Sequence, residues 1–243
     1  MSVSVAVAGA TGRLGTFVCE VIDEYPGFDL TARLTSSSGP EEGADAQVLV
    51  DVTHPEVSPG IVERAVRAGQ RVIVGTSGWS ADRLAWLRQL VDDTDGAAVI
   101  VVPNFSLGSV IGTMLARIAA PHFDSIEIIE AHHAGKADSP SGTAVRTAEL
   151  MTAARNGRHV EAPFTHQPAR GQQVAGIPVH SLRQRGVVAR QEVHFGGEGE
   201  ELTITHVTHS STSYGAGIRA ALDAIGRIDG LVVGLENVLG LDS

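Results

Sequence analysis

One segment of the chain concentrates side chains that can move protons and bind anions. It spans residues 130–144, reads EAHHAGKADSPSGTA, and contains His132, His133 and Lys136. Lys136 is the single lysine among 18 basic residues, which indicates a position where arginine cannot substitute. Lysine has a compact ammonium group and can give up a proton near neutral pH when its surroundings lower its pKa. Histidine and lysine together predict a site that binds a small carboxylate and protonates it.

The end of the same segment adds backbone donors for an anion. Residues 141–143, Ser-Gly-Thr, open a helical pattern, and the first turn of a helix has N–H groups without intrahelical partners. A metal ion is the competing interpretation for the two adjacent histidines. Neighbouring side chains on a strand point to opposite faces, and neither a cysteine nor a third spaced ligand accompanies them. We therefore expect no metal at this site.

A second group of residues has the types and spacing that suit a dinucleotide. Gly9, Gly12 and Gly15 follow a strand pattern and lead into a helical one. Such glycines allow a tight turn, close approach of the backbone to a pyrophosphate, and close helix packing. Two later strands end in loops at 75–77 and 102–105, the edge of an open α/β sheet where ligands bind. A pure packing role for the glycines is the alternative, and without a G-K-[ST] sequence a Walker-type site is not expected.

The stretch after the second predicted strand bears on which nicotinamide cofactor is used. NAD-specific sites usually place Asp or Glu about 20 residues beyond the glycines. Residues 32–38, ARLTSSS, contain no carboxylate, but they contain Arg33 and four hydroxyl side chains. We therefore expect a preference for NADPH, with Arg33 at the 2′-phosphate. The alternative is an ordinary loop with a solvent-exposed arginine.

The elements that must position these residues alternate between strands and helices in the first part of the chain. Their order predicts a parallel sheet with right-handed crossovers. Strands are expected at 3–8, 28–34, 72–74 and 99–102, with a further strand within 44–53 that lies around 48–50 and ends at Asp51. Helices are expected after the glycines and at 61–68 and 81–91.

The pattern changes after Phe105, where an α+β domain is expected to begin. It contains a helix at 109–119, a strand at 125–130 and two or three β segments within 176–209, with Gly196-Gly197 as a turn. A last helix is expected at 217–226, and a strand at 231–233 is expected to return to the first sheet.

Composition excludes several classes of protein. The chain has 243 residues, of which 43% are hydrophobic and 19% charged, as in globular proteins. The net charge of -10 argues against nucleic-acid binding. No apolar run approaches the ~18 residues of a membrane span, and the N-terminus lacks the basic region of a signal peptide. With Cys19 as the only cysteine, an internal disulfide is excluded, and we expect a cytoplasmic protein.

Segment 130–144 resembles the E-x-H-H-x-x-K-x-D-x-P-S-G-T-A signature of the dihydrodipicolinate reductase family of bacterial lysine biosynthesis. Further segments are similar to the family in the same order, and together they cover nearly the whole chain. They are the glycine-rich 9–15, Asp-Val-Thr-His-Pro at 51–55, Gly-Thr-Ser-Gly at 75–78 and Pro-Asn-Phe-Ser at 103–106.

The resemblance implies a reductase that uses NADPH or NADH on 4-hydroxy-tetrahydrodipicolinate and gives tetrahydrodipicolinate, in the diaminopimelate route to L-lysine. It implies an α/β fold with an N-terminal Rossmann domain, residues 1–105 and 214–243. Residues 106–213 would form an α+β C-terminal domain whose mixed sheet binds substrate and builds a homotetramer.

The resemblance also implies roles for individual residues. His132 and Lys136 would donate protons, and His133, Gly142 and Thr143 would contact substrate. The implied cofactor contacts are Gly9, Ala10, Thr11, Gly12, Arg13, Leu14, Gly75, Thr76, Ser77, Val102, Pro103, Asn104 and Phe105.

Two departures from the family pattern lie outside the catalytic segment. Thr35 stands where many members have an acidic residue, which argues against NADH. Residues 209–213 lack an arginine that many members have, which bears on oligomer contacts or local loop order.

Two other functions remain alternatives. One is an amino-acid dehydrogenase with similar glycines, which would lack the H-H-x-x-K sequence. The other is a non-catalytic NADPH-binding regulator, which would have no need of proton donors.

Overall fold

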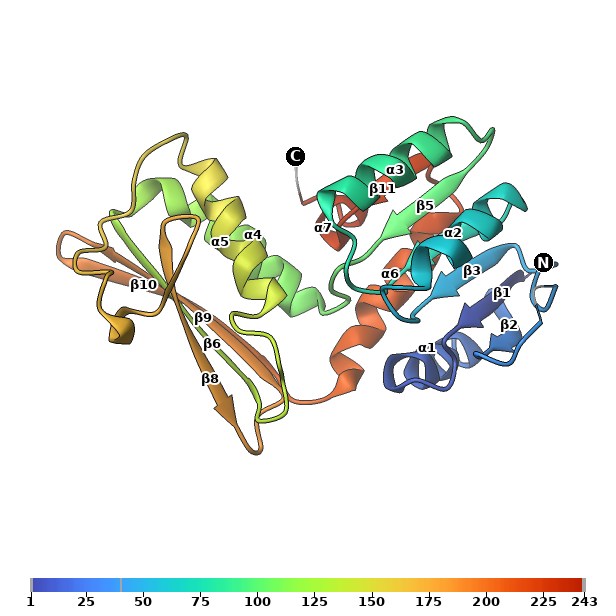
Figure 1. Cartoon of the computed structure of the whole chain (residues 1–243), viewed down its shortest axis with the longest axis horizontal. Helices are drawn as coiled ribbons and strands as arrows, with labels where there is room; N and C mark the ends of the chain where they lie inside the picture. Colours follow the sequence, from blue (N-terminus) through green and yellow to red (C-terminus); the bar gives the residue numbers. More distant parts are fainter. Residues whose placement is uncertain (1, 40, 242–243) are drawn as a thin grey trace. The chain divides into compact units, whose positions relative to one another are not determined.

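Short runs of valine, isoleucine and alanine build the first sheet, because both of its faces are buried. The computed structural model describes residues 2–39 and 41–241 and places this sheet in unit 1, formed by residues up to 107 and from 214 onward. All strand pairs are parallel, in the order β11-β5-β4-β3-β1-β2 (Figure 1). The strands are β1 (Val3–Ala8), β2 (Phe28–Leu34), β3 (Val48–Asp51), β4 (Arg71–Val74), β5 (Ala98–Val101) and β11 (Gly230–Val233).

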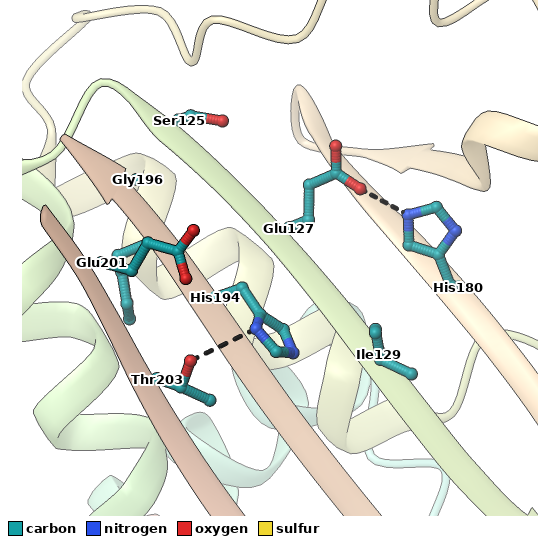
Figure 2. A pocket seen from close by; sticks show the side chains of 9 residues that line it. Ser125, Glu127, Ile129, His180, His194, Gly196, Glu201 and Thr203 are labelled. Atoms are coloured by element: carbon teal, nitrogen blue, oxygen red, sulfur yellow. Dashed lines mark hydrogen bonds and ion pairs between the residues drawn. The ribbon is translucent and has the colours of Figure 1, made fainter. Parts of the chain in front are cut away.

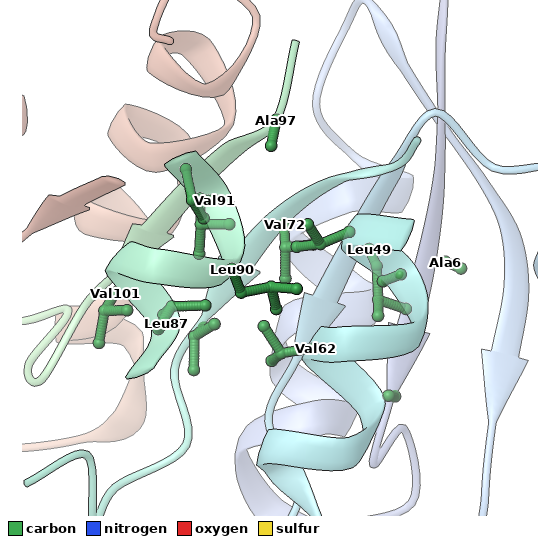
Figure 3. Packing of buried hydrophobic residues seen from close by; sticks show 14 of the residues in the cluster. Ala6, Leu49, Val62, Val72, Leu87, Leu90, Val91, Ala97 and Val101 are labelled. Atoms are coloured by element: carbon green, nitrogen blue, oxygen red, sulfur yellow. The ribbon is translucent and has the colours of Figure 1, made fainter. Parts of the chain in front are cut away.

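Helices cover both faces of this sheet. Alternation along the strands sends Ala6 and Leu49 toward α2 (Ser58–Arg67) and α3 (Ala81–Asp92), as Figure 3 shows. Their neighbours in the sequence, such as the buried Val5 and Val50, face the other way. Helices α1 (Arg13–Asp23) and α6 (Gly215–Ile225) pack against each other, and α6 also packs against β4 and β5; the short α7 spans Leu235–Val238.

Both tryptophans of the chain belong to unit 1. Trp79 and Trp86 stack with ring centroids 6.4 Å apart, and Trp79 packs against the core beneath α2 and α3. Tryptophan fluorescence therefore reports on unit 1 alone.

Unit 2, residues 108–213, is built on a mixed sheet in the order β10-β9-β6-β8-β7. β6 and β8 are parallel, whereas the other pairs are antiparallel. Helices α4 (Leu107–Ala119) and α5 (Gly142–Ala154) pack with one face in a core that includes Ile126, Met151 and Phe195. The strands are β6 (Ser125–His133), β7 (Gln172–Val174), β8 (Ile177–Gln184), β9 (Ala189–Gly197) and β10 (Glu200–Thr208); 3-10 turns occur at Ala120–His122, Pro168–Arg170 and Ser211–Tyr214.

The other face of this sheet is polar and hollowed. Glu127 bonds the ring of His180 at 2.7 Å, and Thr203 lies 3.3 Å from the ring of His194. These side chains line a shared pocket, which Figure 2 shows.

The predicted fold class is confirmed, with two corrections. Gly196 and Gly197 are not a turn, because both lie in β9 and pair with Glu201 and Glu200; the chain turns after them, at Gly199, where φ is +75°. The strand predicted at 125–130 continues to His133, so both histidines lie on β6.

Candidate functional site

A buried carboxylate organises the catalytic segment of unit 2. Glu130 is 0% exposed, and its Oε2 lies 2.6 Å from Nδ1 of His132. Arg183 forms two bonds to the same carboxylate, each 2.9 Å long. The parallel register of β6 and β8 sets Arg183 opposite His132 and Ser181 opposite Glu130. This register brings the side chains of Glu130, His132 and Arg183 together.

The pKa values of this cluster are set by burial and by charge. Burial lowers the pKa of His132, aided by the charges of Lys136 and Arg183, while the bond to Glu130 opposes the change. Burial alone would raise the pKa of Glu130, but bonds from Arg183, Ser181 and His132 outweigh it and lower that pKa. Glu130 is therefore ionised, and its partners serve as donors.

The loop after β6 is tied to the same carboxylate. Lys136 pairs with Asp138 at 2.7 Å, and this bond lowers the pKa of Asp138. Arg183 donates a 2.6 Å bond to the Asp138 carbonyl, and the N–H of Ser141 donates to Glu130 at 3.2 Å. Arg183 and Glu130 together thus link the strand, the loop and the start of the next helix.

The start of α5 has the geometry of an anion site. The Ser141 hydroxyl caps the helix by accepting from the N–H of Ala144. The N–H groups of Gly142 and Thr143 make no bond to any part of the chain that the structure describes. A Cβ added to Gly142 would meet nothing within 4 Å, so there is open space beside its Cα. His133 is exposed at the end of β6.

The glycine turn of unit 1 is tightly built. Gly9 has φ +85°, and a Cβ there would lie 2.6 Å from the Val52 carbonyl oxygen. A Cβ on Gly15 would lie 2.0 Å from the Gly9 oxygen, so only glycine permits this contact between helix and turn. At Gly12 a Cβ would meet only that same oxygen, at 3.3 Å.

Gly12 is also the N-cap of α1, and it provides no capping side chain. An open cradle at an uncapped helix start suits the pyrophosphate of a dinucleotide, so the residues present fit that cofactor. In the same turn Thr11 and Arg13 are exposed, Leu14 is half-buried and Ala10 is buried.

A second buried carboxylate, Asp51, joins the loops at this edge of the sheet. It accepts from the hydroxyls of Ser58, Thr76 and Thr53, the last two at 2.9 and 2.5 Å, and from the Thr53 N–H. The Thr76 hydroxyl is thereby engaged within the protein. Asp51 was not predicted as a site residue, although it closes the strand before the Thr-His-Pro motif.

The remaining predicted cofactor contacts follow β4 and β5. Phe105 is buried against Gly75, where a Cβ would come within 2.5 Å of its ring. The Asn104 side chain accepts from the N–H of Ser106 at 2.8 Å. Ser77 and Pro103 are exposed, and Val102 is buried.

Arg33 lies at the end of β2, the position predicted to meet a 2′-phosphate. It is more than half exposed and forms a 2.5 Å ion pair with Asp23 of α1. The hydroxyls of the next turn bond within it, for example Thr35 to Ser37 at 2.9 Å.

Comparison with known proteins assigns both parts of the chain. Residues 3–105 match the family model described as "Dihydrodipicolinate reductase, N-terminus", and residues 108–239 match "Dihydrodipicolinate reductase, C-terminus". The chain belongs to the dihydrodipicolinate reductase family. The resemblance inferred from the motifs is confirmed.

Individual relatives of this family are similar over most of their length. A 4-hydroxy-tetrahydrodipicolinate reductase of Clavibacter michiganensis subsp. michiganensis is 52% identical, with 100% of this chain and 88% of the relative covered. The Streptomyces coelicolor enzyme of the same name is 40% identical, with 98% of each covered. The dipicolinate-bound dihydrodipicolinate reductase of Paenisporosarcina sp. TG-14 superposes with a TM-score of 0.84 at 29% identity, covering 98% of this chain and 99% of that one.

Sequence reasoning found the candidate donors of this reductase family but missed the residues that hold them. Glu130 stood within the motif without an assigned role, and Arg183 was not singled out. The available signal was periodicity, because Glu130 and His132 are two residues apart on a strand and share a face. Among the described residues no cluster of three or more His, Cys, Asp and Glu is arranged to hold a metal ion. None of the described helices is long and apolar enough to cross a membrane.

Proposed function

We propose that the chain reduces 4-hydroxy-tetrahydrodipicolinate with NADPH or NADH and gives tetrahydrodipicolinate, in the diaminopimelate route to lysine. The observation that carries this proposal is the grouping of His132, Lys136 and the α5 start in a chain of this family. A dicarboxylate is the substrate class that the free N–H groups and the lysine suit. The grouping of proton donors argues against a non-catalytic regulator.

The chain's own residues divide the work between binding and proton transfer. The N–H groups of Gly142 and Thr143 bind one substrate carboxylate, and His133 contacts the substrate. Lys136 supplies a positive charge and a second proton source, exchanging its Asp138 partner for the substrate. The 4-hydroxyl group of the substrate leaves as water with a hydrogen from the neighbouring ring carbon, and His132 donates the proton that accompanies the hydride. The Gly9–Leu14 turn and the loops at 75–77 and 102–105 would hold a reduced nicotinamide, which would supply the hydride when bound.

We further infer a preference for NADPH, a homotetramer and a cytoplasmic location. The preference is supported by Arg33 and by the lack of a carboxylate at residues 32–38, although NADPH must displace Asp23 from Arg33. The homotetramer is supported by the polar, hollowed face of the unit 2 sheet (Figure 2). The location is supported by a single, buried, free cysteine, Cys19.

A coupled assay tests the reaction. The substrate is made in situ by dihydrodipicolinate synthase, and loss of reduced-nicotinamide absorbance is followed with NADPH and NADH separately. We expect oxidation that depends on the synthase product and is faster with NADPH. No oxidation with either cofactor, while either still binds, would reject the reductase and favour a regulator.

The Lys136→Ala variant tests the assigned site. It should bind cofactor like the wild type and lose most of its turnover. Unchanged turnover would remove Lys136 from the mechanism.

A further inference from the structure

Glu130, which contacts the proposed proton donor His132, is itself fully buried. Both of its oxygens are occupied: Oε2 by His132 and Arg183, and Oε1 by Arg183 and the Ser141 N–H. Arg183 is anchored in turn by the carbonyls of Asp138 and Leu182. The carboxylate is therefore held in place from both sides.

This arrangement determines which ring nitrogen of His132 carries a proton in the neutral state. An ionised carboxylate can only accept, so the 2.6 Å contact requires a proton on Nδ1. The other nitrogen, Nε2, is then the atom that gains and loses a proton during turnover. A histidine in the opposite tautomer would leave Glu130 facing a lone pair.

We propose that Glu130 and Arg183 are a positioning pair for His132: Glu130 holds the Nδ1 proton so that Nε2 delivers the proton to substrate, and Arg183 balances the carboxylate charge. The inference rests on the proposed function, and neither residue needs to touch the substrate. Without Arg183, the carboxylate would keep the imidazolium protonated and make it a weaker acid.

Glu130 and Arg183 act on the pKa of His132 in opposite directions. Glu130 favours the imidazolium, whereas Arg183 and Lys136 disfavour it, and Asp138 is paired with Lys136. Removing Glu130 must lower the pKa of His132, and removing Arg183 must raise it. General damage to the fold would not produce opposite shifts.

The test is an NMR titration of the His132 ring in the full chain, without cofactor or substrate, the resonance being assigned with His132→Asn. In Glu130→Gln the pKa should fall by about one pH unit or more, the usual effect of losing an adjacent opposite charge. In Arg183→Gln it should rise by a similar amount. An unchanged pKa in Glu130→Gln overturns the proposal.

Arg183→Gln leaves a buried carboxylate without its counter-charge and is at risk of not folding. Arg183→Lys therefore serves as the second variant, because it keeps the charge; the pKa of His132 should stay near the wild-type value. If it rises in Arg183→Lys as far as expected for Arg183→Gln, charge balance is not the role of Arg183.

A matched control is the Glu–His pair on β9, where Glu192 and His194 are also two residues apart and 3.0 Å from each other. Glu192→Gln should leave the pKa of His132 unchanged. A shift equal to that of Glu130→Gln would mean that the effect is not local.

The coupled assay separates this inference from the proposed function. In Glu130→Gln we expect kcat to fall about 100-fold or more with little change in KM, as for loss of tautomer control in other histidine acids. An inactive wild type would reject the reductase assignment. An active wild type with wild-type kcat in Glu130→Gln would reject the positioning role alone.

Discussion

At the scale of single residues, His132 and His133 show that identical side chains next to each other can have different surroundings. His132 is largely buried and bonded to Glu130, whereas His133, the next residue on β6, is exposed. Alternation along the strand sends them to opposite faces. His132 therefore has the fixed orientation that the proposed proton donation requires.

The pH dependence of turnover should follow His132. In the proposed mechanism His132 acts in its protonated form, so activity is expected below its pKa and should be lost as the pH rises through that pKa. Since burial lowers that pKa, kcat/KM should fall as the pH rises through a value below the usual ~6.5. The anionic substrate favours the imidazolium, so the same limb in kcat should lie at higher pH.

Rate measurements between about pH 5 and pH 9 check this, with His132→Asn as the comparison. In that variant the fall in rate with rising pH should disappear, and kcat should drop by about 10²- to 10⁴-fold. If the fall in rate with rising pH persists in the variant, a group other than His132 causes it.

The candidate donors could be predicted from sequence, but their supports could not. Chemistry-bearing residue types cluster within one short segment, which marks His132 and Lys136 directly. Arg183 lies far from them along the chain, and only the parallel pairing of β6 with β8 brings it to Glu130. Strand register across such a separation depends on tertiary packing, which local patterns do not encode.

At the scale of elements, the contact between α1 and the glycine turn separates two roles of glycine. Gly15 is required because the helix touches the turn, whereas Gly12 borders the space assigned to the pyrophosphate.

The substitutions Gly15→Ala and Gly12→Ala should therefore differ. Gly15→Ala should destabilise unit 1 by about 1–3 kcal/mol, because the new methyl group overlaps the Gly9 carbonyl. Gly12→Ala should leave stability nearly unchanged and weaken NADPH binding about tenfold, or ~1.4 kcal/mol. Urea unfolding measures the stability of each variant, and cofactor titration measures its affinity for NADPH. Equal losses of stability in the two variants would show that the two glycines do not have different roles.

The Asp51 carboxylate predicts a second stability effect in unit 1. Asp51→Ala leaves the hydroxyls of Ser58 and Thr76 without their acceptor, which should cost about 2–4 kcal/mol. Asp51→Asn keeps one acceptor oxygen and should cost less. Urea unfolding followed by the fluorescence of Trp79 and Trp86 gives both values; similar costs for the two variants would contradict an acceptor role.

Element types were easier to predict than their ends. The strand at Phe28–Leu34 matches the prediction residue for residue, because it has strong periodicity and clear boundaries. The Gly196-Gly197 prediction was wrong because adjacent glycines are typical of turns, yet here pairing with Glu200 and Glu201 keeps both in the strand.

At the scale of the whole molecule, the two units have separate cores, and we expect them to respond differently to acid. The lowered pKa of Glu130 stabilises the folded state above the unfolded pKa of ~4.3, and this contribution is lost as the pH falls through the folded value. Each pH unit between the two pKa values is worth about 1.4 kcal/mol.

As the pH falls below the unfolded value of about 4.3, unit 2 should therefore lose stability more steeply in the wild type than in Glu130→Gln. Urea midpoints from far-UV circular dichroism measure the difference. Tryptophan fluorescence, which reports on unit 1, should be the same in both proteins. If the urea midpoint from circular dichroism falls equally steeply with pH in both proteins, Glu130 does not determine the loss of stability in acid.

The division of unit 1 between the two ends of the chain has a consequence for its synthesis on the ribosome. Residues 108–213 emerge before α6 and β11, so unit 2 is complete while the first sheet still lacks both. Until then β5 is an edge strand with unpaired backbone groups, and the apolar surface that α6 covers on β4 and β5 is open. The nascent chain must keep an unfinished sheet from pairing with other chains until its last helix and strand arrive.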